Sequence, residues 1–329
     1  MATYKGIKGV KVLSKASDPT VSEALGTVWY NTASTALKYA ISGAGTWASG
    51  GNTAHERHYC GMAKNGTQNA GLVFCGFDGP TWPSPGTVLQ TESYNGTSWT
   101  ELNNQNTTRA LPGGTGLQTA ALCWAGTPYV PSGTARTPNT EKWDGTCWTE
   151  VNNVLSQVSA PGSVGTQTAA LSVGGSIPPR TVNTQEWDGT SWTEVANLPA
   201  GISNNSSCGT VTAGLNASGS PGQDKKVQTW DGTSWTEVNS LTTNHSNAGS
   251  FGSQTSNIIA GGEPPNTSDV EQYDGTSWTE VANLASAKYG MGGSGTTSSG
   301  LIVGGVTPTS KVTEEWTDPV YAIKTVTVS

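Results

Sequence analysis

One short phrase recurs six times along the 329-residue chain, and it constrains the fold more than any other feature. The copies run from a shortened first one to near-identical later ones: GTWASG (Gly45–Gly50), YNGTSWTEL (Tyr94–Leu102), WDGTCWTEV (Trp143–Val151), WDGTSWTEV (Trp187–Val195 and Trp230–Val238) and YDGTSWTEV (Tyr273–Val281). Their shared tryptophans lie at successive steps of 52, 49, 44, 43 and 43 residues: Trp47, Trp99, Trp148, Trp192, Trp235 and Trp278. Repeats of this period are single supersecondary modules that stack into a ring or an array.

The repeat unit Ser159–Val195 divides at its glycines and prolines. It predicts four short strands: Ser159–Val164, Thr168–Val173, Thr184–Trp187 and Ser191–Val195. Asp188-Gly189 joins the last two strands, and this dipeptide is a hairpin signal because it tolerates the positive φ angles of a type I′ turn. Four antiparallel strands per repeat predict one blade of a β-propeller.

Pairs of inner strands also recur six times: Gly66–Phe74, Gly116–Cys123, Gly165–Val173, Gly209–Ala217, Gly252–Ala260 and Gly295–Val303. The chain opens with an outer hairpin, Leu37–Ala48, and closes with an inner pair and a third strand, Lys311–Trp316. We therefore predict an all-β, six-bladed propeller with four antiparallel strands per blade. Its closing blade joins N-terminal outer strands from Gly26–Ser49 to C-terminal strands from Lys288–Trp316, which removes a free sheet edge.

This pattern assigns residues 26–317 to the propeller, 1–25 to an N-terminal attachment arm or extra strand, and 318–329 to a C-terminal strand or tail. Tyr4–Leu13 and Ala322–Val328 are both strand-like, and we expect them to pair beside the closing blade. The alternative is a flexible attachment arm, with Ser17-Asp18-Pro19 as a break.

Composition narrows the class of protein further. Glycine is 43 of 329 residues, about twice the usual share of ~7%, which suits short strands and tight turns. The net charge of −7 argues against nucleic-acid binding, which needs clustered basic residues. No stretch approaches the ~18 apolar residues that span a bilayer, and the N-terminus lacks a signal-peptide core, so we expect neither membrane insertion nor export. The five cysteines, an odd number in unlike places of the repeat, are expected to be free thiols.

A diglycine precedes an aromatic residue by 11 or 12 positions in several repeats, as in Gly262 to Tyr273, and a tryptophan follows. This order resembles a kelch repeat. Only four residues separate Tyr273 from Trp278, which agrees with a period below the ~50 residues typical of kelch repeats. Some repeats lack the first glycine, as in Cys75-Gly76 and Ala125-Gly126.

A closer resemblance covers nearly the whole chain. It is carried by SDPTVSEALGTVWYNTASTALKYAISGAGTWASGG (Ser17–Gly51), by GTQTAAL (Gly165–Leu171) and by the repeated WDGTSWTEV. These segments resemble kelch-like structural proteins of tailed bacteriophages, especially marine ones. The resemblance implies a virion component of the tail, fibre or capsid surface, made in the host cytoplasm and oligomeric in the particle. The partners it implies are other virion proteins and, at the host surface, a glycan.

The repeated acids sit in hairpin turns, where bonds from side chain to backbone explain them: Asp144, Asp188, Asp231 and Asp274. We therefore expect the repeated aspartates and tryptophans to be structural. No Ser-His-Asp set is arguable, and P-loop and dinucleotide glycine motifs are absent. The expectation is a protein without catalytic residues or cofactor, and not an enzyme.

One ligand-like cluster is HERHYC, with His55, His58 and Cys60. Histidine and cysteine at such spacings bind zinc, but a structural zinc site takes four ligands and no fourth is evident. We therefore expect no metal. Arg57 and Arg109 stand where kelch repeats often carry arginine, and we expect both to be structural.

Long variable loops follow the second strand of some repeats, and variable loops on a rigid scaffold are where recognition usually lies. Trp82 in Asp78–Val88 and Tyr129 in Thr127–Pro138 are the candidate binding residues, able to stack on a sugar ring or a partner protein. The alternative is that both fold back onto their own blade.

The sequence thus predicts a non-enzymatic virion structural protein that makes assembly contacts, with host-surface glycan binding through its loops. The first alternative is a free kelch-like protein that binds a peptide or glycan. The second and less favoured one is a polysaccharide-degrading enzyme, which would need a carboxylate cluster at one mouth of the channel.

Overall fold

The computed structural model describes residues 12–19, 27–42, 45–79, 86–128, 135–177, 180–222, 225–306, 310–318 and 321–326. Regular structure in these ranges consists of β-strands, and the chain divides into two compact units. The large unit is Thr46–Thr317, and the small unit combines Met1–Gly45 with Asp318–Ser329. Within the described ranges, no helix is long and apolar enough to cross a membrane.

The described strands of the large unit form six four-stranded antiparallel sheets. The first two sheets contain β5 (Gly61–Met62), β6 (Leu72–Phe74), β7 (Thr91–Tyr94) and β8 (Trp99–Leu102), then β9 (Gly113–Leu117), β10 (Ala120–Trp124), β11 (Thr140–Trp143) and β12 (Trp148–Val151). The next two contain β13 (Gly162–Gly165), β14 (Ala170–Val173), β15 (Thr184–Trp187) and β16 (Trp192–Val195), then β17 (Ser206–Thr210), β18 (Ala213–Ala217), β19 (Val227–Trp230) and β20 (Trp235–Val238). The last two contain β21 (Gly249–Ser253), β22 (Ser256–Ala260), β23 (Val270–Tyr273) and β24 (Trp278–Glu280), then β25 (Gly292–Thr296), β26 (Ser299–Val303), β27 (Thr313–Thr317) and β4 (Thr46–Ser49).

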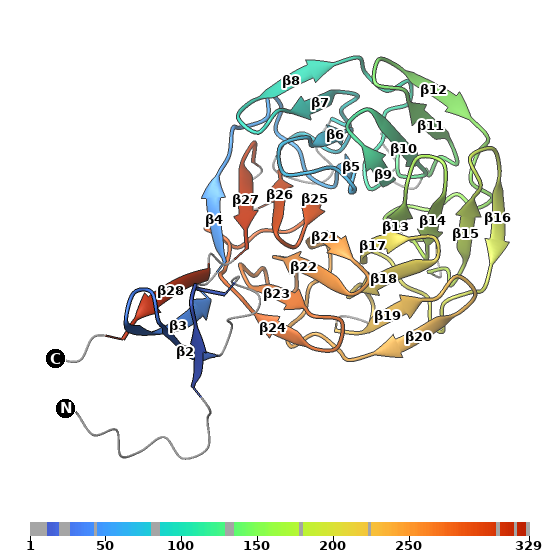
Figure 1. Ribbon diagram of the computed structural model, residues 1–329. Helices are drawn as coiled ribbons and strands as arrows, with labels where there is room; N and C mark the ends of the chain where they lie inside the picture. Colours follow the sequence, from blue (N-terminus) through green and yellow to red (C-terminus); the bar gives the residue numbers. More distant parts are fainter. Residues whose placement is uncertain are drawn as a thin grey trace. The chain divides into compact units, whose positions relative to one another are not determined.

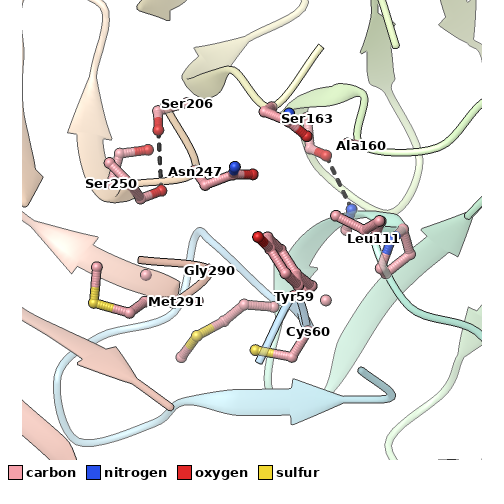
Figure 2. Close-up of a pocket in the computed structure, with 18 of the residues that line it drawn as sticks. Tyr59, Cys60, Leu111, Ala160, Ser163, Ser206, Asn247, Ser250, Gly290 and Met291 are labelled. Atoms are coloured by element: carbon pink, nitrogen blue, oxygen red, sulfur yellow. Dashed lines mark hydrogen bonds between the residues drawn. The ribbon is translucent and has the colours of Figure 1, made fainter. Parts of the chain in front are cut away.

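Figure 1 shows these sheets arranged around a common centre, which is the arrangement of a β-propeller. The first strand of each sheet lies innermost, and the strand that contains the repeated tryptophan lies outermost. The inner strands surround a central channel, part of whose lining is drawn in Figure 2. The predicted all-β, propeller-like fold of four-stranded antiparallel sheets is thereby confirmed.

Small residues fill the innermost strands because the sheets converge there. All four residues of β13 are buried, and a Cβ on Gly113 of β9 would lie only 2.2 Å from the Trp124 ring. At the outer edge, the hairpin aspartates hold their turns: Asp144 Oδ1 accepts hydrogen bonds from the backbone N–H groups of Thr146 and Cys147, each at 2.8 Å. The same pair of bonds recurs at the equivalent aspartates Asp188, Asp231 and Asp274.

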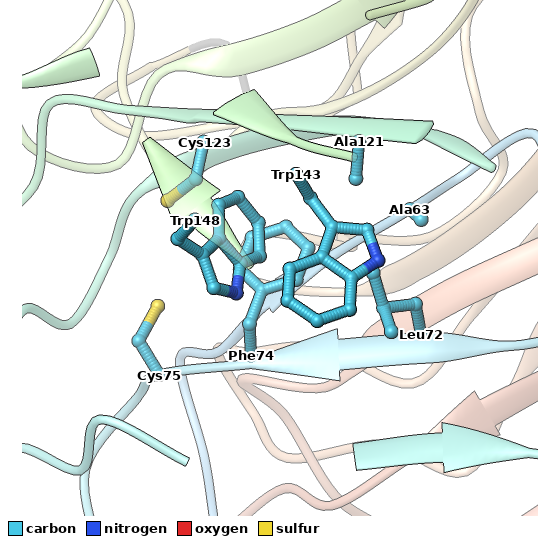
Figure 3. Packing of buried hydrophobic residues seen from close by; sticks show 8 residues of the cluster. All are labelled: Ala63, Leu72, Phe74, Cys75, Ala121, Cys123, Trp143 and Trp148. Atoms are coloured by element: carbon cyan, nitrogen blue, oxygen red, sulfur yellow. The ribbon is translucent and has the colours of Figure 1, made fainter. Parts of the chain in front are cut away.

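The repeated tryptophans pack between neighbouring sheets. Trp148 of the second sheet lies edge-on to Phe74 of the first, with ring centroids 4.9 Å apart, in the cluster drawn in Figure 3. Its Nε1 donates to Thr91 Oγ1 at 2.8 Å. Thr91 is the first residue in the third strand of the preceding sheet. Three further tryptophans donate to the threonine at the equivalent position: Trp192 to Thr140, Trp235 to Thr184 and Trp99 to Thr313. The last of these joins the first sheet to the sixth.

The sixth sheet combines both ends of the large unit. β4 pairs antiparallel with β27, with Trp47 opposite Trp316 and Thr46 opposite Thr317. This closing sheet therefore takes only Thr46–Ser49 from the predicted segment Gly26–Ser49, and the unit boundary lies after residue 45 instead of at the predicted residue 26. The difference arises because the strands before β4 pair with one another.

The small unit contains a separate four-stranded sheet in the order β1 (Leu13–Lys15), β2 (Val28–Asn31), β3 (Ala36–Ser42) and β28 (Tyr321–Thr325). β28 pairs with β3. Most of Tyr4–Leu13, the predicted partner of Ala322–Val328, lies outside the described residues. Asp18 ties the sheet together by accepting from Lys38 Nζ at 2.7 Å, Asn31 Nδ2 at 2.6 Å and Trp29 Nε1 at 3.2 Å. The bonds from Lys38 and Asn31 lower the pKa of Asp18.

A buried contact between a basic residue and a glutamate recurs in four of the six sheets of the large unit. The pairs are Arg57–Glu92, Arg109–Glu141, His245–Glu271 and Lys288–Glu314. In the other two sheets, Val158 or Ile202 replaces the cation, and the glutamate position holds Gln185 or Gln228. Each buried glutamate is thus present only where a basic residue accompanies it, as expected because an unpaired buried charge is costly.

Trp278 lacks the hydrogen bond that its counterparts make. Its buried Nε1 has no partner, because the position equivalent to Thr91 is Val227, which packs in the same cluster. We predict that Val227→Thr raises the free energy of unfolding by about 1 kcal/mol, since a buried donor gains an acceptor. Denaturant unfolding measures this change.

The matched control is Val270→Thr at the equivalent position of the next sheet. Trp47 is the repeated tryptophan of the sheet that follows Val270, and its Nε1 already donates to Ala282 O at 2.9 Å. The added hydroxyl should therefore destabilise the protein. Equal effects of the two substitutions would contradict the explanation.

The paired replacements predict a compensation within the second sheet. Arg109→Val should lower the free energy of unfolding by about 3–5 kcal/mol, because Glu141 would remain buried without its cation. The double variant Arg109→Val with Glu141→Gln copies the third sheet and should recover most of the loss. A double-mutant cycle from denaturant unfolding tests this, and additive effects would refute the coupling.

Acid should weaken the fifth sheet through Glu271. Burial opposes ionisation of Glu271, but bonds from His245 and from the N–H groups of Thr242 and Thr243 outweigh it and lower the pKa to about 2. Because the pKa falls on folding, the stabilisation is complete above about pH 4.5 and is lost as the pH falls toward 2. In melting curves over this range, Glu271→Gln should flatten the fall in melting temperature, whereas Glu150→Gln, at an exposed glutamate, should not.

Candidate functional site

A ring of backbone hydrogen bonds surrounds one mouth of the channel. Its members lie twelve residues after each repeated tryptophan: Tyr59, Leu111, Ala160, Asn204, Asn247 and Gly290. Each N–H donates to the carbonyl oxygen of the member before it, with N···O distances of 2.7–3.1 Å. The bond from Tyr59 N to Gly290 O, at 2.7 Å, closes the ring.

All six members adopt a left-handed backbone conformation, with φ between 50° and 70°. Five of them are not glycine, and this conformation costs such residues roughly 1 kcal/mol or more each. The closed set of hydrogen bonds offsets that cost. Since the backbone makes these bonds, the side chains at the six positions are free to differ, and they do.

Inside this ring lies a cavity of about 90 Å³. Its lining comes from the ring members and from the inner strands, including Met62, Ser163, Ser206 and Ser250. Figure 2 shows Tyr59 extending across it, opposite Ser206 and Ser163. The volume is well below the roughly 300–1,000 Å³ of sites for whole drug-sized molecules. The cavity therefore suits a small group, such as the end of a larger ligand.

Aromatic side chains gather on one side of the mouth. The Tyr59 ring lies 6.1 Å from that of Tyr289 and 6.4 Å from that of Phe77, between centroids. It also lies against the Gly290 backbone, where an added Cβ would be 3.2 Å from the ring. His58 packs on the same group, and burial lowers its pKa to about 4, so it is neutral near pH 7.

Polar groups complete this side of the mouth. Asn247 Nδ2 donates to Glu263 Oε1 at 2.8 Å. Burial and the nearby Glu263 carboxylate raise the pKa values of Tyr59 and Tyr289, so both keep hydroxyl groups that can donate. A half-buried aromatic ring, an amide and a carboxylate in one place can bind a ring-shaped polar group. The aromatic ring contacts the face of that group, and the amide and carboxylate form hydrogen bonds with its hydroxyls.

The candidate binding residues from the sequence, Trp82 and Tyr129, lie outside the described residues. The mouth residues were missed because their chemistry does not repeat. The signal that would have found them is their constant distance from the repeated tryptophan, since Trp47 and Tyr59 are separated as Trp235 and Asn247 are.

The histidines and cysteine of HERHYC do not converge. His55 points to Glu101 at 3.4 Å, whereas His58 joins the aromatic group, and burial raises the pKa of the Cys60 thiol. Over the described part of the chain, no group of three or more His, Cys, Asp or Glu side chains could hold a metal ion. All five cysteines are free.

Comparison with known proteins bears on the fold alone. No protein-family model matches the chain, and no curated protein sequence does. A solved structure described as "Structure of YjhT" resembles it with a TM-score of 0.64 at 12% sequence identity, over 84% of this chain and 99% of the other. As many as 466 chains of solved structures match, so the fold by itself narrows the function little.

Proposed function

We propose that the large unit is a closed, six-bladed, kelch-like propeller. Two contacts between the first and last repeats support closure: the hydrogen bond from Tyr59 N to Gly290 O and that from Trp99 Nε1 to Thr313 Oγ1. Both repeat, at equivalent positions, bonds that join consecutive sheets elsewhere in the unit. Each of the six sheets then counts as one blade.

The function that the channel mouth supports best is non-enzymatic binding of a glycan. The observation that carries this proposal is the group formed by Tyr59, Tyr289, Asn247 and Glu263. A sugar ring offers an apolar face to an aromatic ring and hydroxyls to amide and carboxylate groups. The cavity size favours recognition of a terminal sugar unit over enclosure of a polymer.

We place this binding in a virion, as a tail, fibre or capsid-surface protein of a tailed bacteriophage. The support is the resemblance carried by Ser17–Gly51 and by the repeated phrase. In this proposal the small unit contacts other virion proteins, and the channel mouth or the loops with Trp82 and Tyr129 meet the host-surface glycan. A free glycan- or peptide-binding protein is the alternative.

The described residues that line the channel cavities favour binding over hydrolysis. They include no aspartate or glutamate, whereas a glycoside hydrolase typically uses a pair of carboxyl groups flanking the scissile bond. The proposed protein therefore holds a glycan without cleaving it.

Substitution at the mouth tests the glycan proposal. Tyr59→Ala should weaken binding about tenfold on a panel of bacterial surface glycans, because the aromatic face is lost. The ring of backbone hydrogen bonds already contains an alanine, Ala160, so the fold should persist in this variant. Leu155→Ala, at an exposed leucine outside the lining of the cavity, is the control and should leave binding nearly unchanged.

Two outcomes would count against the proposal. If the wild-type protein binds no glycan of the panel, or if Tyr59→Ala binds as well as wild type, the mouth is not the glycan site. Mass spectrometry of purified virions tests the second part, and absence of the chain from the particles would overturn the virion role.

A further inference from the structure

The first repeat carries two extra residues beside the channel. In five repeats a glycine follows the ring member by five positions, as Gly116 follows Leu111, whereas seven positions separate Tyr59 from Gly66. The two glycines occupy equivalent places in their hairpins, because an added Cβ would lie 2.5 Å from Ala70 O at Gly66 and 2.3 Å from Ala120 O at Gly116. The extra residues, Lys64 and Asn65, are therefore an insertion into one inner hairpin.

The insertion places an ammonium group in the channel. Lys64 Nζ donates to the backbone oxygen of Ser207 at 2.9 Å, and Ser207 belongs to β17, three sheets further round the ring. Lys64 also lines both the cavity at the mouth and a second cavity of about 160 Å³ further along the channel. Its side chain thus spans the channel between the two cavities.

Lys64, which is half-buried, differs in its partner from the buried basic residues of the large unit. The buried basic residues Arg57, Arg109, His245 and Lys288 each face a glutamate. Lys64 has no ion pair among the described residues, and the described lining of both cavities contains no carboxylate. A lysine ammonium has three donors, of which Ser207 O accepts one.

We propose that Lys64 makes the channel a binding site for the carboxylate group of a small ligand. The anion supplies the missing counter-charge, and charge-assisted hydrogen bonds to lysine are among the stronger ones. The cavity of about 90 Å³ is small compared with sites for whole drug-sized molecules, which suits a small carboxylate group.

The titration of the lining residues agrees with this geometry. Burial lowers the pKa of Lys64 to about 8, against a smaller opposing effect of Cys208. The other titratable lining residues, Tyr59, Cys60 and Cys208, all have pKa values raised by burial, that of Cys208 to about 12. Lys64 is therefore the lining residue whose charge changes as the pH rises from 7 to 9.

Tyr59 and Lys64 line the same cavity, so one ligand can meet both. An acidic sugar would bring its ring to the aromatic side and its carboxylate to the lysine. In this form the site rests on the proposed glycan function and specifies an acidic sugar as the terminal unit. The carboxylate site itself does not depend on that function.

Acetate and acetamide are probes of equal size that differ in charge. Titration followed by the NMR amide signals of the inner strands should give acetate binding about tenfold tighter than acetamide binding at pH 6.5. Lys64→Met should abolish the difference, and Lys64→Arg should restore it. Equal binding of the two probes to wild type, or an unchanged preference in Lys64→Met, would overturn the site.

A second measurement covers the case in which Lys64→Met does not fold. In the wild-type protein the acetate preference should disappear as the pH rises from 7 to 9, because the lysine loses its charge while acetate stays ionised. A preference that persists at pH 9 would overturn the role of Lys64.

Galacturonate and galactose separate this site from the glycan proposal. Tighter binding of galacturonate, lost in Lys64→Met, supports both. Binding of galactose with no gain for galacturonate overturns the acidic-sugar form and leaves the glycan function intact. Binding of acetate without either sugar leaves the lysine site and counts against sugar recognition at the mouth.

Discussion

The ring of six backbone hydrogen bonds around the channel mouth is the constraint on which the large unit depends. It links each repeat to the next through one left-handed residue, and the bond from Tyr59 to Gly290 returns to the start. Because the bonds use only backbone atoms, they fix the spacing of the inner strands whatever the side chain. A rigid frame with interchangeable side chains is what a binding surface needs in order to vary without loss of the fold.

Most repeats of the large unit pair a buried basic residue with a glutamate, and the repeats that differ are informative. Where a cation is absent, as at Val158, the carboxylate opposite is replaced by Gln185. That departure preserves the balance of charge and needs no ligand to explain it. Lys64 is a departure of the opposite kind, since it adds a charge and its partner, Ser207 O, is not a carboxylate. A change whose charge is balanced by a second change in the chain belongs to the scaffold. A charge without such a balance points to an interaction with a molecule outside the chain.

The periodic phrase was enough to predict the sheets, the outer hairpins and the joining of the two ends, because each depends on residues that repeat. The boundary at residue 26 was misplaced because strands such as Val28–Asn31 have the same alternating pattern whichever sheet they join. The mouth could not be predicted for a different reason. Its members share a backbone conformation and a constant distance from the repeated tryptophan, but residues as different as Tyr59 and Gly290 share no chemistry that marks them as a site.

The pairing of β4 with β27 has a consequence for the order in which the chain becomes structured. Trp47 is synthesised early, and its strand partner Trp316 emerges from the ribosome only after nearly the entire large unit. Until then β4 has an exposed edge and an unburied indole, and it is prone to pair with another chain. Closure between such distant residues also makes the last step slow. Several nascent chains on one messenger RNA lie close together while their β4 edges are still unpaired. Misassembly between chains is therefore most favoured under that condition.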